Sequence, residues 1–220
     1  MTFPTPPPVA FTSGWPGLPS PGKPKAEDAP RRAREFKAGL RRRAQLKRAA
    51  EVLPQLPGPG ESLHALLTGY FDFALVLTCV LRSRPAPCEA LRVATLSFSK
   101  RNVQEMAGWL DGGLVKRLVL LSSDFMKEGN PATYFGAVKE LAEGRGQAVA
   151  AARCHAKVAC LHFADGLKLA FEGSMNLSTN RNVEQMCVVN DPGLHDWHAQ
   201  WIDSKALAHE SDEGGSPAKG

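Results

Sequence analysis

The 220-residue sequence lacks the features that mark exported and membrane-spanning proteins. Its first residues contain neither the basic segment nor the apolar stretch of a signal peptide. Only residues 63–81 approach the length of a membrane-spanning helix, and this segment contains His64 and Asp72, which are costly at mid-bilayer. We therefore expect a cytoplasmic protein without stable membrane insertion, in which residues 63–81 belong to a buried core.

Disulfide bonds are also not expected. The five cysteines are an odd number and lie in or near apolar runs, which is typical of reduced thiols. Cys154 and Cys160 lie close to histidines, so zinc is an alternative. On a strand, however, residue 155 faces away from residues 154 and 160, and the ligands do not converge. The sequence predicts no metal site and no cofactor.

The length accommodates one domain with its own core, together with tails. Most of the 17 prolines crowd into the first sixty residues, where few residues can anchor a core. The domain organisation predicted from this composition is a disordered Pro-rich tail at 1–30, a basic helix and linker at 31–60, a folded domain at 61–208 and a disordered tail at 209–220.

The excess of basic residues is concentrated before the folded domain. The net charge is +5 and the isoelectric point is near 9.0, and much of the excess lies between residues 23 and 48. A basic face suits a polyanion, most often nucleic acid, but a solvated helix that only keeps the protein soluble explains it equally well. The candidate nucleic-acid contacts are Arg41, Arg42, Arg43, Lys47, Lys100 and Arg101.

Strand and helix patterns alternate after residue 60. Ser62 is a candidate N-cap for a helix through Leu63 and Leu66. Strand patterns occur at 91–98, 115–122, 148–152, 157–163, 167–172 and 185–189. Helical patterns occur at 100–110, 131–143 and 192–207. The alternation favours an α/β domain with a mixed or parallel sheet covered by helices.

One group of polar residues carries the chemistry of a phosphodiester reaction that needs no metal. His155 supplies an imidazole, and Lys157, two residues on, shares its face if both lie on a strand. The Asp165-Gly166 pair predicts a tight turn that brings His155 and Ser174 to the same end of a hairpin. There Gly173 lets a phosphate approach the backbone, and Ser174 and Asn176 offer a hydroxyl and an amide to an oxyanion.

These motifs resemble the phospholipase D superfamily, in which a His-x-Lys and a Gly-Ser-x-Asn flank a hairpin. The residues that carry the resemblance are His155-Ala-Lys157, Gly173-Ser174-Met-Asn176 and Asn182-Val-Glu184-Gln185. The resemblance implies that His155 is the nucleophile and that Lys157 and Asn176 bind phosphate. It further implies that Ser174 is a supporting hydrogen-bonder and that Glu184 orients a histidine.

The sequence departs from the family pattern in two respects. Where the family usually has an aspartate after the lysine, this sequence has His162, and Asp165 follows three residues later. We expect a longer hairpin in which Asp165 takes the turn position, and we count it with the catalytic group. In addition, the family builds one site from two His-x-Lys motifs, and no other histidine here is followed by lysine at the second position. The resemblance therefore predicts a homodimer in which each chain contributes one His155.

The sequence thus predicts a metal-independent phosphodiesterase, and the basic segment favours a nuclease over a lipid-acting enzyme. The alternative is a catalytically silent phospholipase D-like module that binds nucleic acid or takes part in an assembly.

Overall fold

The computed structural model describes residues 31–67, 72–179 and 182–213, with helical side chains described from residue 42 and up to residue 207. The chain divides into two units, Met1–Gly39 and Leu40–Gly220. Helix α1 (Arg31–Val52) agrees with the predicted basic helix and supplies the described part of the first unit. The predicted tail at 1–30 lies outside the described residues. At the other end, helix α6 (Pro192–Glu213) extends past residue 209, where a disordered tail was predicted.

The second unit is built on one mixed sheet of seven strands, in the order β1-β7-β6-β5-β2-β3-β4. Strands β2, β3 and β4 are parallel, and the other neighbouring pairs are antiparallel. The strands are β1 (Ser62–Leu67), β2 (Cys88–Thr95), β3 (Val115–Ser123), β4 (Ala148–Ala152), β5 (Val158–Phe163), β6 (Lys168–Gly173) and β7 (Glu184–Val189). This arrangement confirms the predicted α/β fold with a mixed sheet.

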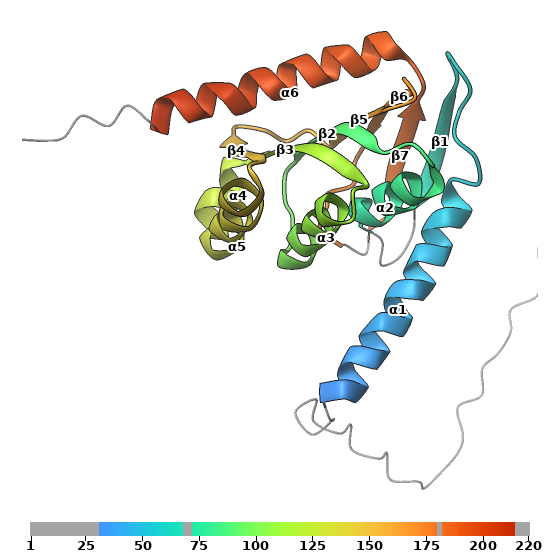
Figure 1. The fold of residues 1–220 in the computed structure, drawn as a ribbon, viewed down its shortest axis with the longest axis horizontal. Coiled ribbons are helices and arrows are strands. Elements are labelled where there is room, and N and C mark those ends of the chain that lie inside the picture. Colours follow the sequence, from blue (N-terminus) through green and yellow to red (C-terminus); the bar gives the residue numbers. More distant parts are fainter. Residues whose placement is uncertain (1–30, 68–71, 180–181, 214–220) are drawn as a thin grey trace, which may run out of the picture. The chain divides into compact units, whose positions relative to one another are not determined.

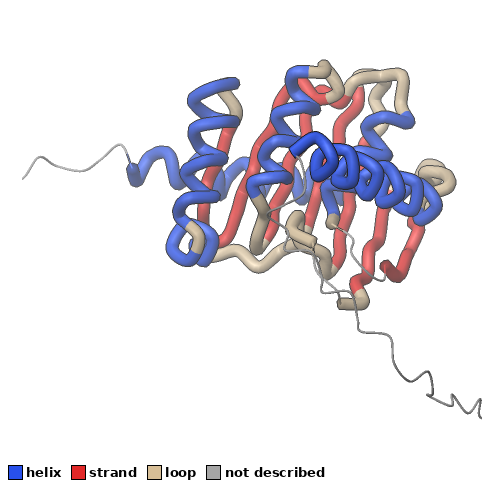
Figure 2. Tube along the Cα trace, turned by 90° about the horizontal axis from the view of Figure 1, so that it is seen from below, coloured by secondary structure: helices blue, strands red, loops and turns tan. Residues whose placement is uncertain are grey.

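Helices cover both faces of the sheet (Figure 1). Helix α6 lies on one face, where Ile202 and Ala206 pack on β2 to β5. On the same face Arg92 Nε of β2 donates a hydrogen bond to Asp203 Oδ1 at 2.9 Å. The remaining helices of the domain lie on the other face, over a larger apolar core. These helices are α2 (Phe73–Ser83), α3 (Lys100–Asp111), α4 (Asp124–Gly129), α5 (Pro131–Ala137) and the π-helix η1 (Val138–Glu143). Figure 2 shows the helices lying over the strands of the sheet.

Local sequence signals explain several boundaries. Helix α2 consists largely of buried apolar residues, and Asp72 caps its first turn by accepting a hydrogen bond from Leu75 N at 2.9 Å. Helix α3 begins with a capping box between Ser99 and Asn102. In the part of the chain that the structure describes, no helix has both the length and the apolar character that crossing a membrane requires.

The prediction of a helix starting at Ser62 was wrong. Residues 62–67 form β1, which pairs antiparallel with β7, so that Leu67 lies opposite Glu184. Exposed positions alternate with half-buried ones along β1, as on an edge strand with one face on the core. A short apolar run cannot distinguish a helix from a strand by periodicity alone, and here the partner strand, distant in the sequence, decides the outcome.

Two other predicted elements differ in detail. The predicted strand at 91–98 begins and ends three residues earlier, as β2. The predicted helix at 131–143 is divided into α5 and η1, and the short helix α4 precedes them.

The topology places the ends of several strands at one edge of the sheet, called here the site edge. The carboxyl ends of β2, β3, β4 and β6 lie there with the amino ends of β5 and β7. Parallel strands commonly bind ligands outside their carboxyl ends.

Candidate active site

His155 and Lys157 lie at the site edge, in the segment that links β4 to β5. The prediction that they share one face of a strand was wrong, because β5 begins only at Val158. The backbone of Lys157 is nevertheless anchored, since its carbonyl accepts a hydrogen bond from Gly173 N at 3.1 Å. The anchor joins the His-x-Lys motif to the Gly-Ser-x-Asn motif, and the side chain of His155 stays exposed to incoming groups.

The two side chains of the His-x-Lys motif contact each other. Lys157 Nζ lies 2.8 Å from His155 Nδ1 and 2.7 Å from the carbonyl oxygen of His155. An ammonium group only donates hydrogen bonds, so Nδ1 accepts and the imidazole proton is carried by Nε2. In this arrangement the imidazole is neutral and its Nε2 carries a proton, so Nε2 cannot act as a nucleophile.

Burial lowers the pKa of Lys157 below its ordinary value of 10.5. The charges of Cys154 and Glu184 act in the opposite direction, so Glu184 is close enough to stabilise the ammonium form. A partly desolvated ammonium beside an exposed imidazole is suited to binding an anionic oxygen.

Gly173 is required by the packing of β6 against β7. A Cβ atom at this position would lie 2.4 Å from the carbonyl oxygen of Gln185 and 3.2 Å from Met186 Cα. That this glycine admits a phosphate to the backbone stays a prediction, and the structure adds a packing role. It lets the two strands approach closely, which brings Ser174 to the start of β7.

Ser174 and Glu184 form a hydrogen-bonded pair across this junction. The hydroxyl of Ser174 donates to the carboxylate of Glu184 and accepts a hydrogen bond from Gln185 N at 3.0 Å. Glu184 is buried, at 9% exposure. The implied role of Glu184 in orienting a histidine stays a prediction, and in this structure its carboxylate accepts the hydrogen bond of the serine hydroxyl.

Asn176 lies on the loop that follows β6. Its carbonyl oxygen accepts a hydrogen bond from Phe73 N at 3.2 Å. Among the described residues its buried Oδ1 has no hydrogen-bond partner. A buried acceptor without a partner is costly, and only a donor can satisfy it. A phosphate oxygen also accepts, so a phosphate at the site would be bound by the amide nitrogen Nδ2 of Asn176.

Residues outside the predicted catalytic group hold the Asn176 loop in place. Thr95 Oγ1 accepts a hydrogen bond from Leu177 N at 3.3 Å, and the hydroxyls of Ser97 and Ser178 lie 2.8 Å apart. Asp72 accepts a hydrogen bond from Thr179 Oγ1 at 3.2 Å. Two of these residues had a signal in the sequence. Ser97 lies at the carboxyl end of the first predicted strand, where α/β sheets place ligands, and Asp72 is a capping residue directly before the apolar run of α2.

Asp165 lies at the opposite end of the β5–β6 hairpin from His155. It occupies the turn, where Oδ1 accepts a hydrogen bond from Leu167 N at 3.3 Å and Arg84 forms an ion pair with Oδ2. The six residues of β5 separate this turn from the site edge, a distance of roughly 20 Å. The structure therefore contradicts the assignment of Asp165 to the catalytic group.

The candidate nucleic-acid contacts differ in their availability. Arg42 is not free, because it forms ion pairs with Asp72 and Glu105 and its side chain is 14% exposed. Burial lowers the pKa of Arg42 and raises that of Glu105, as in a structural pair within the domain. Arg43, Lys47, Lys100 and Arg101 are exposed, whereas the side chain of Arg41 lies outside the described residues.

One chain encloses little of the site. The crevice beside Lys157 has no room for a water molecule, with a cavity volume of about 0 Å³. Its lining comes from α2, β6, β7 and neighbouring residues, namely Phe73, Lys157, Glu172, Gly173, Met175, Gln185 and Met186. Drug-sized ligands usually occupy pockets of about 300–1,000 Å³. No three His, Cys, Asp or Glu side chains within the described ranges come together as a metal site.

Comparison with known proteins gives structural likenesses only. No family model and no curated protein matches the sequence. Nuc from Salmonella typhimurium, a phospholipase D family member, is 15% identical over 66% of this chain and 94% of its own, with a TM-score of 0.46. NucT from Helicobacter pylori is 18% identical over 68% of this chain and 98% of its own, with a TM-score of 0.47. TrmBL2, an archaeal chromatin protein, is 13% identical over 79% of this chain and 63% of its own, with a TM-score of 0.46.

Proposed function

We propose that the protein is a phospholipase D-like phosphodiesterase that cleaves nucleic acid without a metal ion, through a phosphohistidine on His155. One observation carries the proposal. A backbone hydrogen bond joins Lys157 to Gly173, so that an imidazole, an ammonium and the Ser174–Glu184 pair gather at the site edge. These groups supply a nucleophile, a phosphate ligand and a buried carboxylate.

The reaction has two steps. In the first, His155 Nε2 attacks phosphorus, a P–N bond forms and the bond to the leaving oxygen breaks, while a second imidazole, protonated on both nitrogens, gives that oxygen a proton. In the second, the now neutral second imidazole takes a proton from water, the water oxygen attacks phosphorus and the P–N bond breaks. Lys157 and Asn176 bind the non-bridging oxygens, whose negative charge grows in each transition state.

The second imidazole comes from a second copy of the chain. The sequence contains one His-x-Lys motif, and the crevice beside Lys157 is too small to enclose a substrate. A dimer about a two-fold axis places the partner subunit's His155 opposite the first, so that one acts as nucleophile and the other as acid.

In the resting protomer the Lys157–His155 contact holds a neutral imidazole. With Nδ1 accepting from Lys157, the only ring proton is on Nε2. Both roles begin when Lys157 moves to a substrate phosphate and frees Nδ1. In the nucleophilic protomer Nδ1 then carries the proton and Nε2 attacks. In the acid protomer Nδ1 takes up a second proton, and the imidazolium gives its Nε2 proton to the leaving oxygen.

Nucleic acid is the substrate class that the charge distribution favours. Arg43, Lys47 and Lys100 are exposed, and none of the three pairs with a carboxylate among the described residues. The rival proposal is a catalytically silent module that uses the same basic residues for binding or assembly.

The test is incubation of wild type and His155→Ala with single- and double-stranded DNA and RNA in excess EDTA, followed by product sizing. We expect cleavage by the wild type alone and an acid-sensitive phosphoryl label trapped on His155. Binding without cleavage by either protein supports the silent module, and equal cleavage by both proteins contradicts the proposal.

Mixed dimers test the shared site. Wild-type and His155→Ala chains are unfolded together and refolded at varied ratios. If each site needs both imidazoles, activity falls with the square of the wild-type fraction, whereas a linear decline contradicts the two-chain site. Sedimentation of the wild type provides the matching measurement, since an active monomer excludes the dimer.

A further inference from the structure

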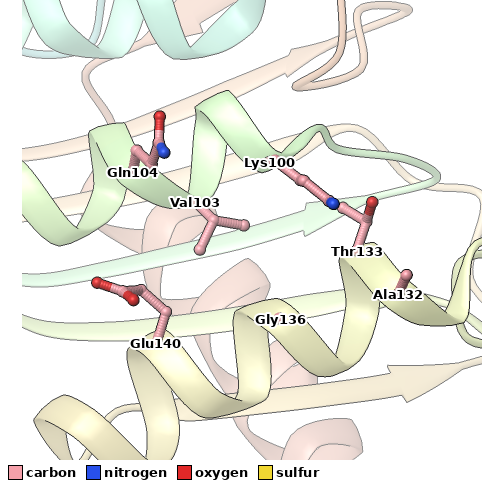
Figure 3. Close-up of a pocket in the computed structure, with 7 residues that line it drawn as sticks. All are labelled: Lys100, Val103, Gln104, Ala132, Thr133, Gly136 and Glu140. Atoms are coloured by element: carbon pink, nitrogen blue, oxygen red, sulfur yellow. The ribbon is translucent and has the colours of Figure 1, made fainter.

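A recess of about 330 Å³ lies between α3 and the helical segment formed by α5 and η1 (Figure 3). This volume is within the range of small-ligand pockets, about 300–1,000 Å³. Apolar or small residues form the middle of the recess, where Val103 faces Gly136. Polar groups stand at its two ends, with Lys100 and Thr133 at one and Gln104 and Glu140 at the other.

The two ends differ in charge. The carboxylate of Glu140 is already bound by Arg145 at 2.8 Å. Lys100 points toward Thr133 and has no ion-pair partner in the part of the chain that the structure describes (Figure 3). The Lys100 end therefore presents an unneutralised positive charge, which suits an anionic group such as phosphate.

Lys100 stands in the first turn of α3, and the positive end of this twelve-residue helix also favours an anion. Asn102, in the same turn, does not line the recess. It is 1% exposed, and its Oδ1 closes the capping box by accepting hydrogen bonds from Ser99 N at 2.9 Å and from Ser99 Oγ at 2.7 Å.

The recess lies along the same sheet edge as His155. Helix α3 starts just beyond β2, and β2 lies between β5 and β3 in the sheet, so the lateral separation is roughly 10 Å, or two strand spacings. The Thr95–Leu177 and Ser97–Ser178 contacts connect the approach to α3 with the Asn176 loop. A chain of nucleotides bound at the site can therefore continue into the recess.

We infer that the recess holds an unpaired nucleotide flanking the scissile phosphate, with its phosphate at Lys100 and its base between Val103 and Gly136. The inference rests on the proposed function and narrows its substrate to single-stranded nucleic acid. A base can enter such a recess only after it leaves its pairing and stacking partners, which costs least in a single strand.

Gly136 allows the recess to be filled without disturbing the fold. It lies within α5, and a Cβ atom there would meet nothing within 4 Å. Gly136→Leu therefore places a side chain into the recess at a helical position where leucine is favoured over glycine. Gly108→Leu is the matched control, because Gly108 is also helical with open space and lines a different recess beside Trp109.

The experiment measures binding and catalysis separately. Anisotropy of a labelled single-stranded oligonucleotide is measured in a His155→Ala background, with Gly136→Leu, Gly108→Leu or Lys100→Ala added. Hydrolysis of bis(4-nitrophenyl) phosphate, which is too small to reach the recess, is measured in chains that keep His155.

We expect Gly136→Leu and Lys100→Ala each to weaken single-strand binding at least about five-fold, because the first fills the space for the base and the second removes a charged phosphate contact. Gly108→Leu should bind like the parent, and Gly136→Leu should hydrolyse the small diester as the wild type does. Unchanged binding by Gly136→Leu, or an equal loss of duplex binding, overturns the inference. If the wild type hydrolyses no diester, the proposed function fails, while the binding measurements still decide whether the recess takes a nucleotide.

Discussion

The two ends of the β5–β6 hairpin contain similar residue types and use them differently. At the turn, Asp165 pairs with Arg84, and Lys168 donates to Asp196 at 2.7 Å. At the site edge, Lys157 contacts an imidazole and a carbonyl oxygen, with no carboxylate in direct contact within the described residues. Charge at the turn is matched by opposite charge, whereas charge at the site edge is available to a substrate.

Hydrogen bonding does not separate the two ends in the same way. The turn backbone is bonded through Phe163, Gly166 and Leu167. Among the described residues, buried atoms without a hydrogen-bond partner occur at both ends, namely Oδ1 of Asn176 at the site edge and Nε of Arg84 and Nε2 of His195 at the turn. The contrast between the two ends therefore rests on charge.

Lys157→Gln gives the largest effect that the comparison predicts. Removal of a cationic phosphate ligand should lower kcat roughly 10²-fold, as for the loss of one oxyanion donor. Lys168→Gln, at the turn end of the same hairpin, is the matched control and should cleave nearly as the wild type does. Steady-state cleavage of an oligonucleotide by the two variants decides the matter, and equal losses would remove the distinction between the two ends.

The pH profile sharpens the same prediction. Burial lowers the pKa of Lys157, so the ammonium form that binds phosphate is lost at a pH below the ordinary value of 10.5. Cleavage by the wild type should therefore decline on the alkaline side before pH 10.5. Because Lys157→Gln has no such group, its residual activity should lack this decline.

Gly173→Ala tests the packing of the site edge. The added Cβ would meet the carbonyl oxygen of Gln185 at 2.4 Å, so β6 and β7 must separate, at a cost of about 1–3 kcal/mol in unfolding free energy. Gly136→Ala is the control, since a helical glycine with open space should gain up to about 1 kcal/mol. Chemical denaturation measures both, and an unchanged midpoint for Gly173→Ala would contradict the close approach of the strands.

Much of this site could be predicted from the sequence because its signals are local. The spacing of His155 and Lys157, and of Gly173, Ser174 and Asn176, is visible without the fold. The Asp165-Gly166 turn was correctly placed, with Gly166 at a φ of +88°, and it fixed which ends of the hairpin meet. The alternation of strands and helices likewise followed from periodicity.

The failures came from contacts between residues distant in the sequence. Residues 62–67 could be assigned to a strand only by their pairing with β7, and Arg42 is withdrawn from the basic surface by Asp72 and Glu105. The packing role of Gly173 depends on the backbone of β7. Asp165 was assigned to the site because it follows the His-x-Lys motif in the chain, as an aspartate does in the family. Its own turn signal already placed it at the far end of the hairpin.

For His195, at the turn end, we expect a smaller effect, a dependence of folding stability on pH. Burial lowers the pKa of His195 below 6.5, against the opposing effect of Asp196, while Lys168 lies nearby and the ring of His162 is 6.2 Å away. Below pH 6.5 the unfolded chain binds more protons at this position than the folded chain. Folding stability should therefore fall as the pH drops below 6.5 toward the lowered pKa.

His195→Gln should flatten this part of the stability profile, and His64→Gln, at an exposed position on β1, should leave it unchanged. Urea denaturation of the three proteins between neutral and mildly acidic pH compares them directly. A wild-type profile that matches that of His195→Gln would show that His195 titrates alike in both states.

Asp165→Asn should have the smallest effect of all. An asparagine can still accept the hydrogen bond from Leu167 N, and only the exposed ion pair with Arg84 is lost, so stability should change little. Cleavage should match the wild type, because roughly 20 Å of hairpin separates the turn from His155. Glu184→Gln, which changes the carboxylate bound by Ser174 at the site edge, should by contrast lower cleavage. If Asp165→Asn reduced cleavage as strongly as Glu184→Gln, the turn would have to reach a catalytic group, and the division between the two ends of the hairpin would be wrong.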